Sequence, residues 1–373
     1  MWRYSNPVAI TFGVEAFAEL PKLIGGQPYA LVTYPDAPFA ALAGRLCAAA
    51  GEPAVTVGDV APNPDTKLLA DQSARFSAAG EPKAIVALGG GSVIDTAKVL
   101  AAARGGFAPV LRYLQTGGSA EALSATPIIA VPTTAGTGSE VTCWATVWDT
   151  QSGKKYSLSR PSLYPKHAVV DPTLMVGKPR QLTISTGLDA LSHALESLWN
   201  VNANPISAHH AVVAAREILS VLPQLVQDLK NVELRSRMAA AALSAGLAFS
   251  NTRTAIAHSI SYPVTLHHGV VHGVACSFTL PMILRSVSGV GGLTGSGLAQ
   301  IFGDDLEAGA ARLETFLNDL DVSTDFKSYG VAPDAWTGLI LEAFDGERGQ
   351  NFIGTRQAML QAAGMKEHES ARA

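Results

Sequence analysis

The first half of the chain alternates short apolar runs with longer alanine-rich stretches, and this alternation limits the possible folds most. The apolar runs occupy residues 30–32, 55–57, 84–88 and 128–131, and each is bounded by glycine, proline or polar residues, as buried strands are. Stretches of helical length lie between them, for example at 39–50 and 93–103. Strand–helix–strand alternation predicts a parallel sheet covered on both faces, so we expect a Rossmann-like α/β fold in this half.

The pattern changes near residue 178. A hairpin (141–149 with 155–158) and a short strand (168–170) end the first half, and strand signals then disappear. Alanine- and leucine-rich helical periods follow at 187–199, 206–222, 232–249 and 252–262, with Pro263 expected to end the last one and a Gly/Ser-rich loop expected at 286–297. Because 373 residues exceed what one core usually serves, we expect an α/β domain over 1–178 and an all-helical domain over 179–373.

The composition excludes several classes of partner. The formal net charge is −4 and no basic stretch could follow a phosphate backbone, so we expect no nucleic acid. No apolar run approaches the roughly 18 residues of a membrane span, and residues 1–7 lack the apolar core of a signal peptide. Three scattered cysteines argue against a disulfide framework. We therefore expect a cytoplasmic protein with no membrane partner.

A glycine turn joins the expected strand at 84–88 to the start of a helix. Gly89, Gly90 and Gly91 let the backbone approach a ligand, and Ser92 followed by Asp95 resembles a capping box. The N–H groups at such a helix start bind phosphate. A simple tight turn is the alternative, and the segment lacks the G-x-G-x-x-G dinucleotide fingerprint, so a nucleotide fits the turn without being required by the usual Rossmann pattern.

A second polar loop follows the strand expected at 128–131. Its hydroxyl groups come from Thr133, Thr134 and Thr137, and it also contains Gly136 and Gly138. Ligands of open α/β sheets bind at the carboxyl ends of strands, where both loops are expected to lie. An ordinary polar loop is the alternative, but two such loops after two strands of one sheet favour a ligand cleft.

Four side chains in the second half have the spacing of a metal site. Asp189 and His193 are four residues apart, which places them on one face of a helix, and His258 and His272 follow fourteen residues apart. One carboxylate and three imidazoles suit Fe(II) or Zn(II). Singly, each is more often a buried hydrogen-bonded residue, so the prediction depends on the combination. We expect the nearby Cys276 to be a small buried residue rather than a ligand.

The ordered motifs of the chain resemble the iron-containing, or group III, alcohol dehydrogenase family over nearly the whole length. The matching segments are Pro62-Asn63-Pro64, Gly89–Ser92 with Asp95, Pro132-Thr133-Thr134 with 137–140, Lys155 ten residues before Pro165, Asp171-Pro172, 187–196, 245–251, His258 and His272-Gly273.

The resemblance implies a nucleotide-binding α/β domain, a helical metal domain and an active site in the cleft between them. It implies a metal-dependent, NAD(P)(H)-linked enzyme that interconverts a small aldehyde and its alcohol, and we expect it to be a homodimer. It implies that the metal ligands are Asp189, His193, His258 and His272. The implied cofactor-binding residues are Asn63, Gly90, Gly91, Ser92, Asp95, Thr133, Thr134, Thr137 and Lys155.

Three departures from the family pattern concern the residues around these sites. Tyr262 stands where the family usually has a second histidine, so the catalytic proton donor is Tyr262 or one of the nearby His267 and His268. Tyr34 stands where an aspartate often contacts the adenosine ribose, so NADP(H) is expected to be accepted unless Asp36 substitutes.

The third departure is Arg253, at a position where the family tends to have a small residue. An arginine close to a metal ligand favours an anionic substrate group, whereas a salt bridge to a protein carboxylate is the alternative. The stretch 251–263 is similar to the phosphonoacetaldehyde reductase branch of the family. Arg253 and Asn251 are therefore the candidate substrate-binding residues, and a dehydrogenase of neutral alcohols or a dehydroquinate-synthase-like enzyme is the alternative.

Overall fold

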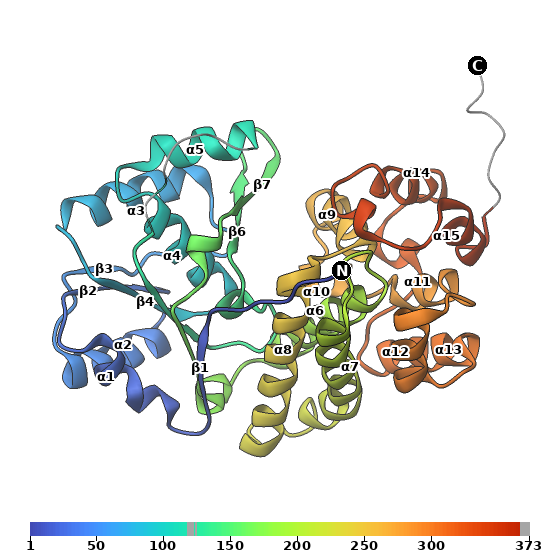
Figure 1. Cartoon of the computed structure of the whole chain (residues 1–373), viewed down its shortest axis with the longest axis horizontal. Coiled ribbons are helices and arrows are strands. Elements are labelled where there is room, and N and C mark those ends of the chain that lie inside the picture. The colour runs from blue at the N-terminus through green and yellow to red at the C-terminus, as the bar shows by residue number, and fades with distance from the viewer. Residues whose placement is uncertain (118–122, 124, 366–373) are drawn as a thin grey trace. The chain divides into compact units, whose positions relative to one another are not determined.

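The computed structural model describes residues 1–117, 123 and 125–365. The chain divides into two units. In Figure 1, residues 6–176 run from blue to green, and the described residues from 177 onward run from green to red. The first, called here the α/β unit, is Asn6–Val176. The second, called the helical unit, consists of Met1–Ser5 and the described residues from Gly177 onward.

The α/β unit is built on a six-stranded parallel sheet with the strand order β1-β8-β5-β4-β2-β3. The strands are β1 (Ala9–Phe12), β2 (Tyr29–Thr33), β3 (Val55–Val57), β4 (Ala84–Gly89), β5 (Ile128–Pro132) and β8 (His167–Val170). Every residue of β2 and β5 is buried, as expected of strands that are covered on both faces. The predicted Rossmann-like α/β fold is confirmed. Strand β1 was not predicted, because it lies at the sheet edge and is largely exposed.

Two apolar clusters cover the two faces of this sheet. Ala87 belongs to one cluster and its neighbour Val86 to the other, since successive side chains of a strand point to opposite faces. One face packs against α3 (Thr66–Ala78), α4 (Gly91–Ala102), α5 (Phe107–Thr116) and the antiparallel hairpin of β6 (Trp144–Asp149) and β7 (Lys154–Ser159). The other face packs against α1 (Leu20–Ile24) and α2 (Ala37–Ala50) (Figure 1).

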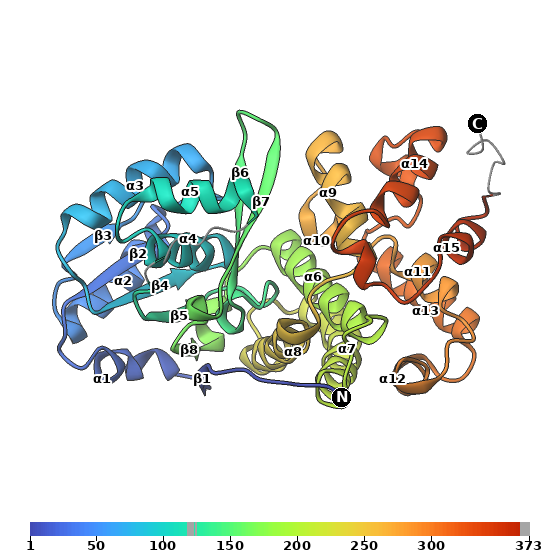
Figure 2. The ribbon, with the colours of Figure 1, turned by 45° about the horizontal axis from the view of Figure 1, so that its top comes forward.

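The helical unit contains no strand among the residues that the structure describes, which confirms the predicted all-helical fold (Figure 2). Its helices are α6 (Arg180–Leu198), α7 (Pro205–Leu225), α8 (Val232–Thr252), α9 (Ile256–His268), α10 (His272–Ala275), α11 (Leu280–Ser286), α12 (Gly292–Phe302), α13 (Leu306–Asp319), α14 (Pro333–Ala343) and α15 (Arg356–Ala362). Every residue of α6 from Gly187 to its end is buried, including several polar side chains. Polar groups on a fully buried helix need partners, so we expect the polar side chains of α6 to bind other residues or a ligand.

Three predicted boundaries in the helical unit are wrong. The helix expected at 252–262 is divided, because α8 ends at Thr252 and Arg253 takes a left-handed φ of 64° before α9 begins. Helix α9 continues past Pro263 to His268, and burial of Ile260 and Val264 on either side of the proline offsets its lost hydrogen bond. The loop expected at 286–297 ends early, since α12 begins at Gly292.

Candidate metal and cofactor sites

Helix α6 supplies the first two metal-ligand candidates. Asp189 and His193 lie one turn apart on its buried face, and their side chains are only 7% and 6% exposed. Nε2 of His193 lies 3.7 Å from Oδ1 of Asp189. The His193 ring is held between two others, with centroids 4.0 Å from Phe249 and 4.7 Å from His258. The four-residue spacing therefore places a carboxylate oxygen and an imidazole nitrogen together.

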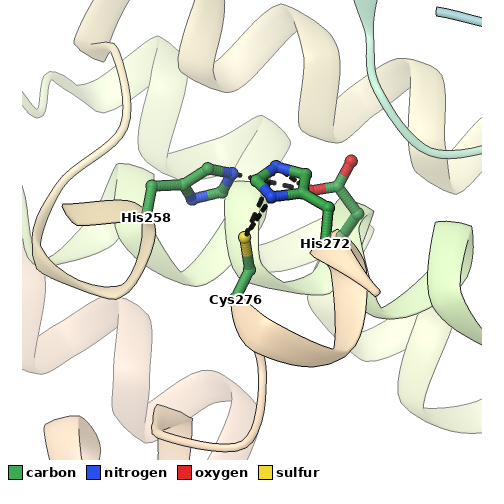
Figure 3. A group of neighbouring side chains, drawn as sticks. His258, His272 and Cys276 are labelled. Carbon is green, nitrogen blue, oxygen red and sulfur yellow. Dashed lines mark hydrogen bonds and ion pairs between the residues drawn. The ribbon is translucent and has the colours of Figure 1, made fainter. Parts of the chain in front are cut away.

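The other two candidates approach the same carboxylate oxygen from later elements. His258 is in the first turn of α9 and His272 begins α10. Their Nε2 atoms lie 3.5 Å and 3.9 Å from Asp189 Oδ1. The side chain of His272 is 41% exposed, so the cluster is open on the side of this ligand. Figure 3 shows the rings of His258 and His272 directed toward one another.

The unsatisfied polar atoms of the cluster fit a metal ion. Within the described residues, the buried Asp189 Oδ1 and His258 Nε2 have no hydrogen-bond partner. Leaving such atoms unpaired costs about 1–3 kcal/mol each, and a bound cation would satisfy both. Two donors at about 2.0–2.2 Å from a tetrahedral ion lie about 3.4 Å apart, close to the 3.5 Å observed between these atoms.

The close approach of these side chains shifts the pKa values of Asp189 and His258. Burial by itself raises the pKa of Asp189, but His193, His258 and His272 outweigh burial and hold this pKa well below its usual value. Burial lowers the pKa of His258, but Cys276, Glu196 and Asp189 outweigh it and raise this pKa well above the usual value. Asp189 is therefore ionised beside a protonated imidazole, and a divalent cation would replace such protons.

Glu196 is a site residue that the sequence analysis did not assign a role. Its Oε2 lies 2.6 Å from Nδ1 of His258, and its Oε1 accepts the backbone N–H of His258 at 3.2 Å. The Glu196 side chain is fully buried. A carboxylate on Nδ1 leaves Nε2 as the ligand nitrogen, which is how metal-bound histidines are commonly oriented. The available signal was the position of Glu196 seven residues after Asp189, on the same face of α6.

Cys276 also belongs to this cluster, although it was expected to be only a small buried residue. Its Sγ lies 3.6 Å from both ring nitrogens of His272 (Figure 3). The ligand atoms of Asp189, His258, His272 and Cys276 all lie within 4.8 Å of one another. Cys276 is fully buried, as expected, but its sulfur is a fifth possible donor.

The glycine turn after β4 lies where the sequence analysis expected it. A Cβ on Gly91 would lie 2.7 Å from the Thr137 side chain, so only glycine allows the turn and the second loop to approach this closely. The helix α4 has Gly90 as its N-cap and no side-chain cap. The suggested capping box of Ser92 and Asp95 is therefore wrong. Uncapped N–H groups at a helix start are suited to an anion.

The structure brings most of the expected cofactor residues together at this turn. Asn63 has a left-handed φ of 59°, and its N–H donates to Ser92 Oγ at 3.2 Å. Thr134 Oγ1 would lie 3.3 Å from a Cβ on Gly90, and Thr133 donates its N–H to Gly89 O at 3.0 Å. These contacts form a backbone-lined cradle within the α/β unit.

Two other expected cofactor residues, Asp95 and Lys155, have contacts within the α/β unit. Asp95 accepts hydrogen bonds from Ser139 Oγ at 2.6 Å and from the N–H of Thr146 at 2.9 Å. The Lys155 ammonium lies 5.1 Å from the centroid of the Trp148 ring. Asp95 thus fixes the second loop and the hairpin against α4.

The three candidate proton donors differ in their surroundings. The ring of Tyr262 is parallel to that of His272, with centroids 6.2 Å apart and planes 2° apart. The guanidinium of Arg348 lies on the Tyr262 ring, 4.8 Å from its centroid. His267 and His268 are exposed in the last turn of α9. Tyr262 is therefore the candidate that contacts a metal-ligand candidate.

The candidate substrate residues have protein partners in the structure. Arg253 forms an ion pair with Glu347, and the two side chains are 54% and 74% exposed. Asn251 accepts the N–H of Ser5 at 3.0 Å and donates to its carbonyl at 3.2 Å. An anion that binds Arg253 must compete with Glu347.

No helix within the described part of the chain combines the length and the apolar character needed to cross a bilayer.

Comparison with known proteins gives relatives over both units. The family model described as iron-containing alcohol dehydrogenase matches residues 7–172, and the C-terminal model of the Fe-containing alcohol dehydrogenase family matches residues 183–362. The chain is 36% identical to the phosphonoacetaldehyde reductase of Streptomyces viridochromogenes, over 63% of this chain. That match spans 60% of the length of the reductase, which is less than two thirds.

Two further similarities extend over more of the chain. The 1,3-propanediol dehydrogenase of Klebsiella pneumoniae is 34% identical over 76% of this chain and 75% of its own length. The crystal structure of sulfoacetaldehyde reductase from Bifidobacterium kashiwanohense, in complex with NAD+, is similar with a TM-score of 0.87 and 29% identity, and the similarity covers 96% of both chains. With both family models matched in order along the sequence, the chain belongs to the iron-containing alcohol dehydrogenase family.

Proposed function

We propose that this chain is a metal-dependent, NAD(P)(H)-linked alcohol dehydrogenase that interconverts a small aldehyde carrying an anionic group and its primary alcohol. The observation that carries the proposal is the convergence of three histidine Nε2 atoms within 3.5–3.9 Å of Asp189 Oδ1. One carboxylate and three imidazoles suit Fe(II) or Zn(II). The family assignment and the phosphate-type cradle of the α/β unit support a nicotinamide cofactor.

The proposed chemistry divides into what the bound groups supply and what the chain supplies. When bound, the metal ion polarises the carbonyl oxygen as a Lewis acid and the nicotinamide exchanges the hydride. Asp189 offsets part of the positive charge of the ion, and Glu196 keeps His258 Nε2 directed into the site. Tyr262 lies beside His272 on the open side of the cluster, so its phenolic hydroxyl is our candidate proton donor, with His267 and His268 as the alternatives.

The proposed substrate class draws on two of the relatives. One is named as a phosphonoacetaldehyde reductase and another as a sulfoacetaldehyde reductase, so both act on an aldehyde with an anionic group. The relative named as a 1,3-propanediol dehydrogenase supports a neutral diol or short-chain alcohol as the alternative. For the cofactor, Tyr34 stands where a carboxylate would disfavour NADP(H), so we propose that both NAD(H) and NADP(H) are accepted.

Consumption of NADH and NADPH by metal-stripped protein reloaded with Fe(II) or Zn(II) tests this function. Phosphonoacetaldehyde, sulfoacetaldehyde, succinic semialdehyde and propanal are the aldehydes to compare. We expect turnover that requires the metal and is lost in Asp189→Asn but retained in His209→Asn, a variant of an exposed histidine on α7. Absence of turnover with every aldehyde and both metals would contradict the proposal and favour the dehydroquinate-synthase-like alternative.

A further inference from the structure

Arg348, which lies in no sequence motif, is an arginine close to the candidate metal cluster. Its guanidinium lies 4.8 Å from the centroid of Tyr262, whose ring is stacked on His272. Both Arg348 and Tyr262 are partly exposed, and His272 is the exposed member of the ligand set. The guanidinium of Arg348 and the exposed ligand candidate His272 thus share one neighbour, the ring of Tyr262.

The charges around Arg348 leave its guanidinium without a carboxylate. Two acidic residues close to Arg348 in the sequence have other partners, since Glu347 pairs with Arg253 and Asp345 pairs with Arg356. Arg348 forms no ion pair with any described residue and donates only its Nε–H, to Thr254 Oγ1 at 3.1 Å. Its two terminal NH2 groups therefore remain available, and this pair of donors matches the oxygens of a carboxylate, sulfonate or phosphonate.

The loop that carries Arg348 is held rigidly. A Cβ on Gly349 would lie 1.8 Å from the carbonyl oxygen of Ala343, so only glycine lets the loop return against the end of α14. Asn351 donates to Thr254 O at 2.9 Å, which fixes the loop to the segment before α9. Ser259 of α9 donates its hydroxyl to Ala343 O at 2.8 Å. A loop held in this way loses little backbone freedom when Arg348 binds an anion.

We infer that Arg348, rather than Arg253, binds the anionic group of the substrate. This inference rests on the proposed function and adds the residue that selects the substrate class. The cation–π contact with Tyr262 and the bond from Nε to Thr254 hold the guanidinium in place, and its two terminal NH2 groups remain for an oxyanion. The ligand class is a short aldehyde with a phosphonate, sulfonate or carboxylate group.

Steady-state kinetics of Arg348→Ala and Arg348→Lys test this assignment. Loss of a charge-assisted bidentate pair is expected to raise KM for phosphonoacetaldehyde roughly 10- to 100-fold, and KM for propanal by less than about threefold. In Arg348→Lys the increase in KM for phosphonoacetaldehyde should be smaller but still present, because lysine keeps the positive charge without the two NH2 donors of a guanidinium. Arg356→Ala is the matched control, since Arg356 already pairs with Asp345. Arg253→Ala tests the rival residue.

A binding measurement separates this inference from the proposed function. Phosphonoacetate, which lacks the aldehyde, is titrated into the metal-loaded protein by calorimetry, and we expect weaker binding in Arg348→Ala by the same factor as the change in KM. Equal losses for anionic and neutral aldehydes, or a selective loss in Arg253→Ala instead, would overturn the role of Arg348. Absence of reduction of every aldehyde would contradict the proposed function. Phosphonoacetate binding that is unchanged in Arg348→Ala would overturn the role of Arg348, whether or not an aldehyde is reduced. If Arg348→Ala does not fold, Arg348→Gln, which can keep the bond to Thr254, replaces it.

Discussion

Glu196 Oε2 lies 2.6 Å from His258 Nδ1, and the two side chains are 0% and 4% exposed. This pair places a second carboxylate behind the metal cluster, on the opposite side of the His258 ring from Asp189. A carboxylate in this position fixes both the tautomer and the orientation of the ring. The pair therefore connects α6 with α9 at the candidate metal site, where the direction of a ligand nitrogen matters most.

The variant Glu196→Gln is expected to weaken metal binding about 10- to 100-fold, because an amide can accept the Nδ1 proton without supplying the negative charge that raises ligand basicity. Competition titration of Zn(II) against a chelator measures the change. Glu217→Gln on α7, where the carboxylate pairs with Arg237 at 2.6 Å, is the control. An affinity equal to that of the wild type would show that Glu196 only fills space.

Cys276 is expected to bias the cluster toward thiophilic ions. Thiolate donors favour Zn(II) over harder ions, and the Cys276 sulfur is within 4.8 Å of the ligand atoms of Asp189, His258 and His272. Cys276→Ser should lower the affinity for Zn(II) more than that for Mn(II), and should remove any thiolate-to-metal charge-transfer absorption of the Co(II)-loaded protein. Cys47→Ser, in the α/β unit, is the control. Absence of such absorption in the wild type would exclude the sulfur as a ligand.

The features that sequence alone could predict are those with a local signature. Strand β4, its glycine turn and the start of α4 form one continuous segment, so their arrangement follows from neighbouring residues. The pair Asp189 and His193 is likewise local, since four residues make one helical turn. Strand β1 had no such signature, because at an exposed edge its burial does not alternate clearly.

The surroundings of the metal cluster depend on contacts between distant residues. Glu196 meets His258 only because α9 packs against α6, a separation of 62 residues. The sequence alone suggests Arg253 as an anion site. In the folded chain Arg253 pairs with Glu347, which is 94 residues away in the sequence. Arg348 has no motif, and its position depends on how the loop after α14 returns to α9. The fold, rather than any local sequence pattern, therefore decides which arginine has terminal NH2 groups that are not paired with a carboxylate.

Gly91→Ala is expected to weaken binding of NAD(H). The added methyl would lie 2.7 Å from the Thr137 side chain, so either α4 or the second loop must move away from the cradle. Overpacking of this kind costs about 1–3 kcal/mol, and part of it should appear as a higher dissociation constant for NADH, measured by fluorescence titration. Gly105→Ala is the matched control, since no atom lies within 4 Å of its added methyl. Equal dissociation constants for the two variants would contradict a cofactor role for this turn.

The buried Glu140, in the 3-10 turn Ser139–Val141, makes the stability of the protein depend on pH. Burial raises the pKa of Glu140 from 4.5 to about 7, against the smaller opposing effects of its backbone hydrogen bond and of Lys98. The folded state then binds more protons than the unfolded state between these two values, so this contribution is complete at acid pH and is lost as pH rises through about 7.

The variant Glu140→Gln removes this titration and isolates its effect. Relative to the variant, the free energy of unfolding of the wild type should fall by roughly 3 kcal/mol between pH 4.5 and pH 7.5, which corresponds to the raised pKa. Urea unfolding of both proteins across this range measures the difference. Glu52→Gln serves as the control at an exposed position. A difference between wild type and Glu140→Gln that stays constant with pH would show that Glu140 is already ionised at pH 5 in the folded protein, despite its burial.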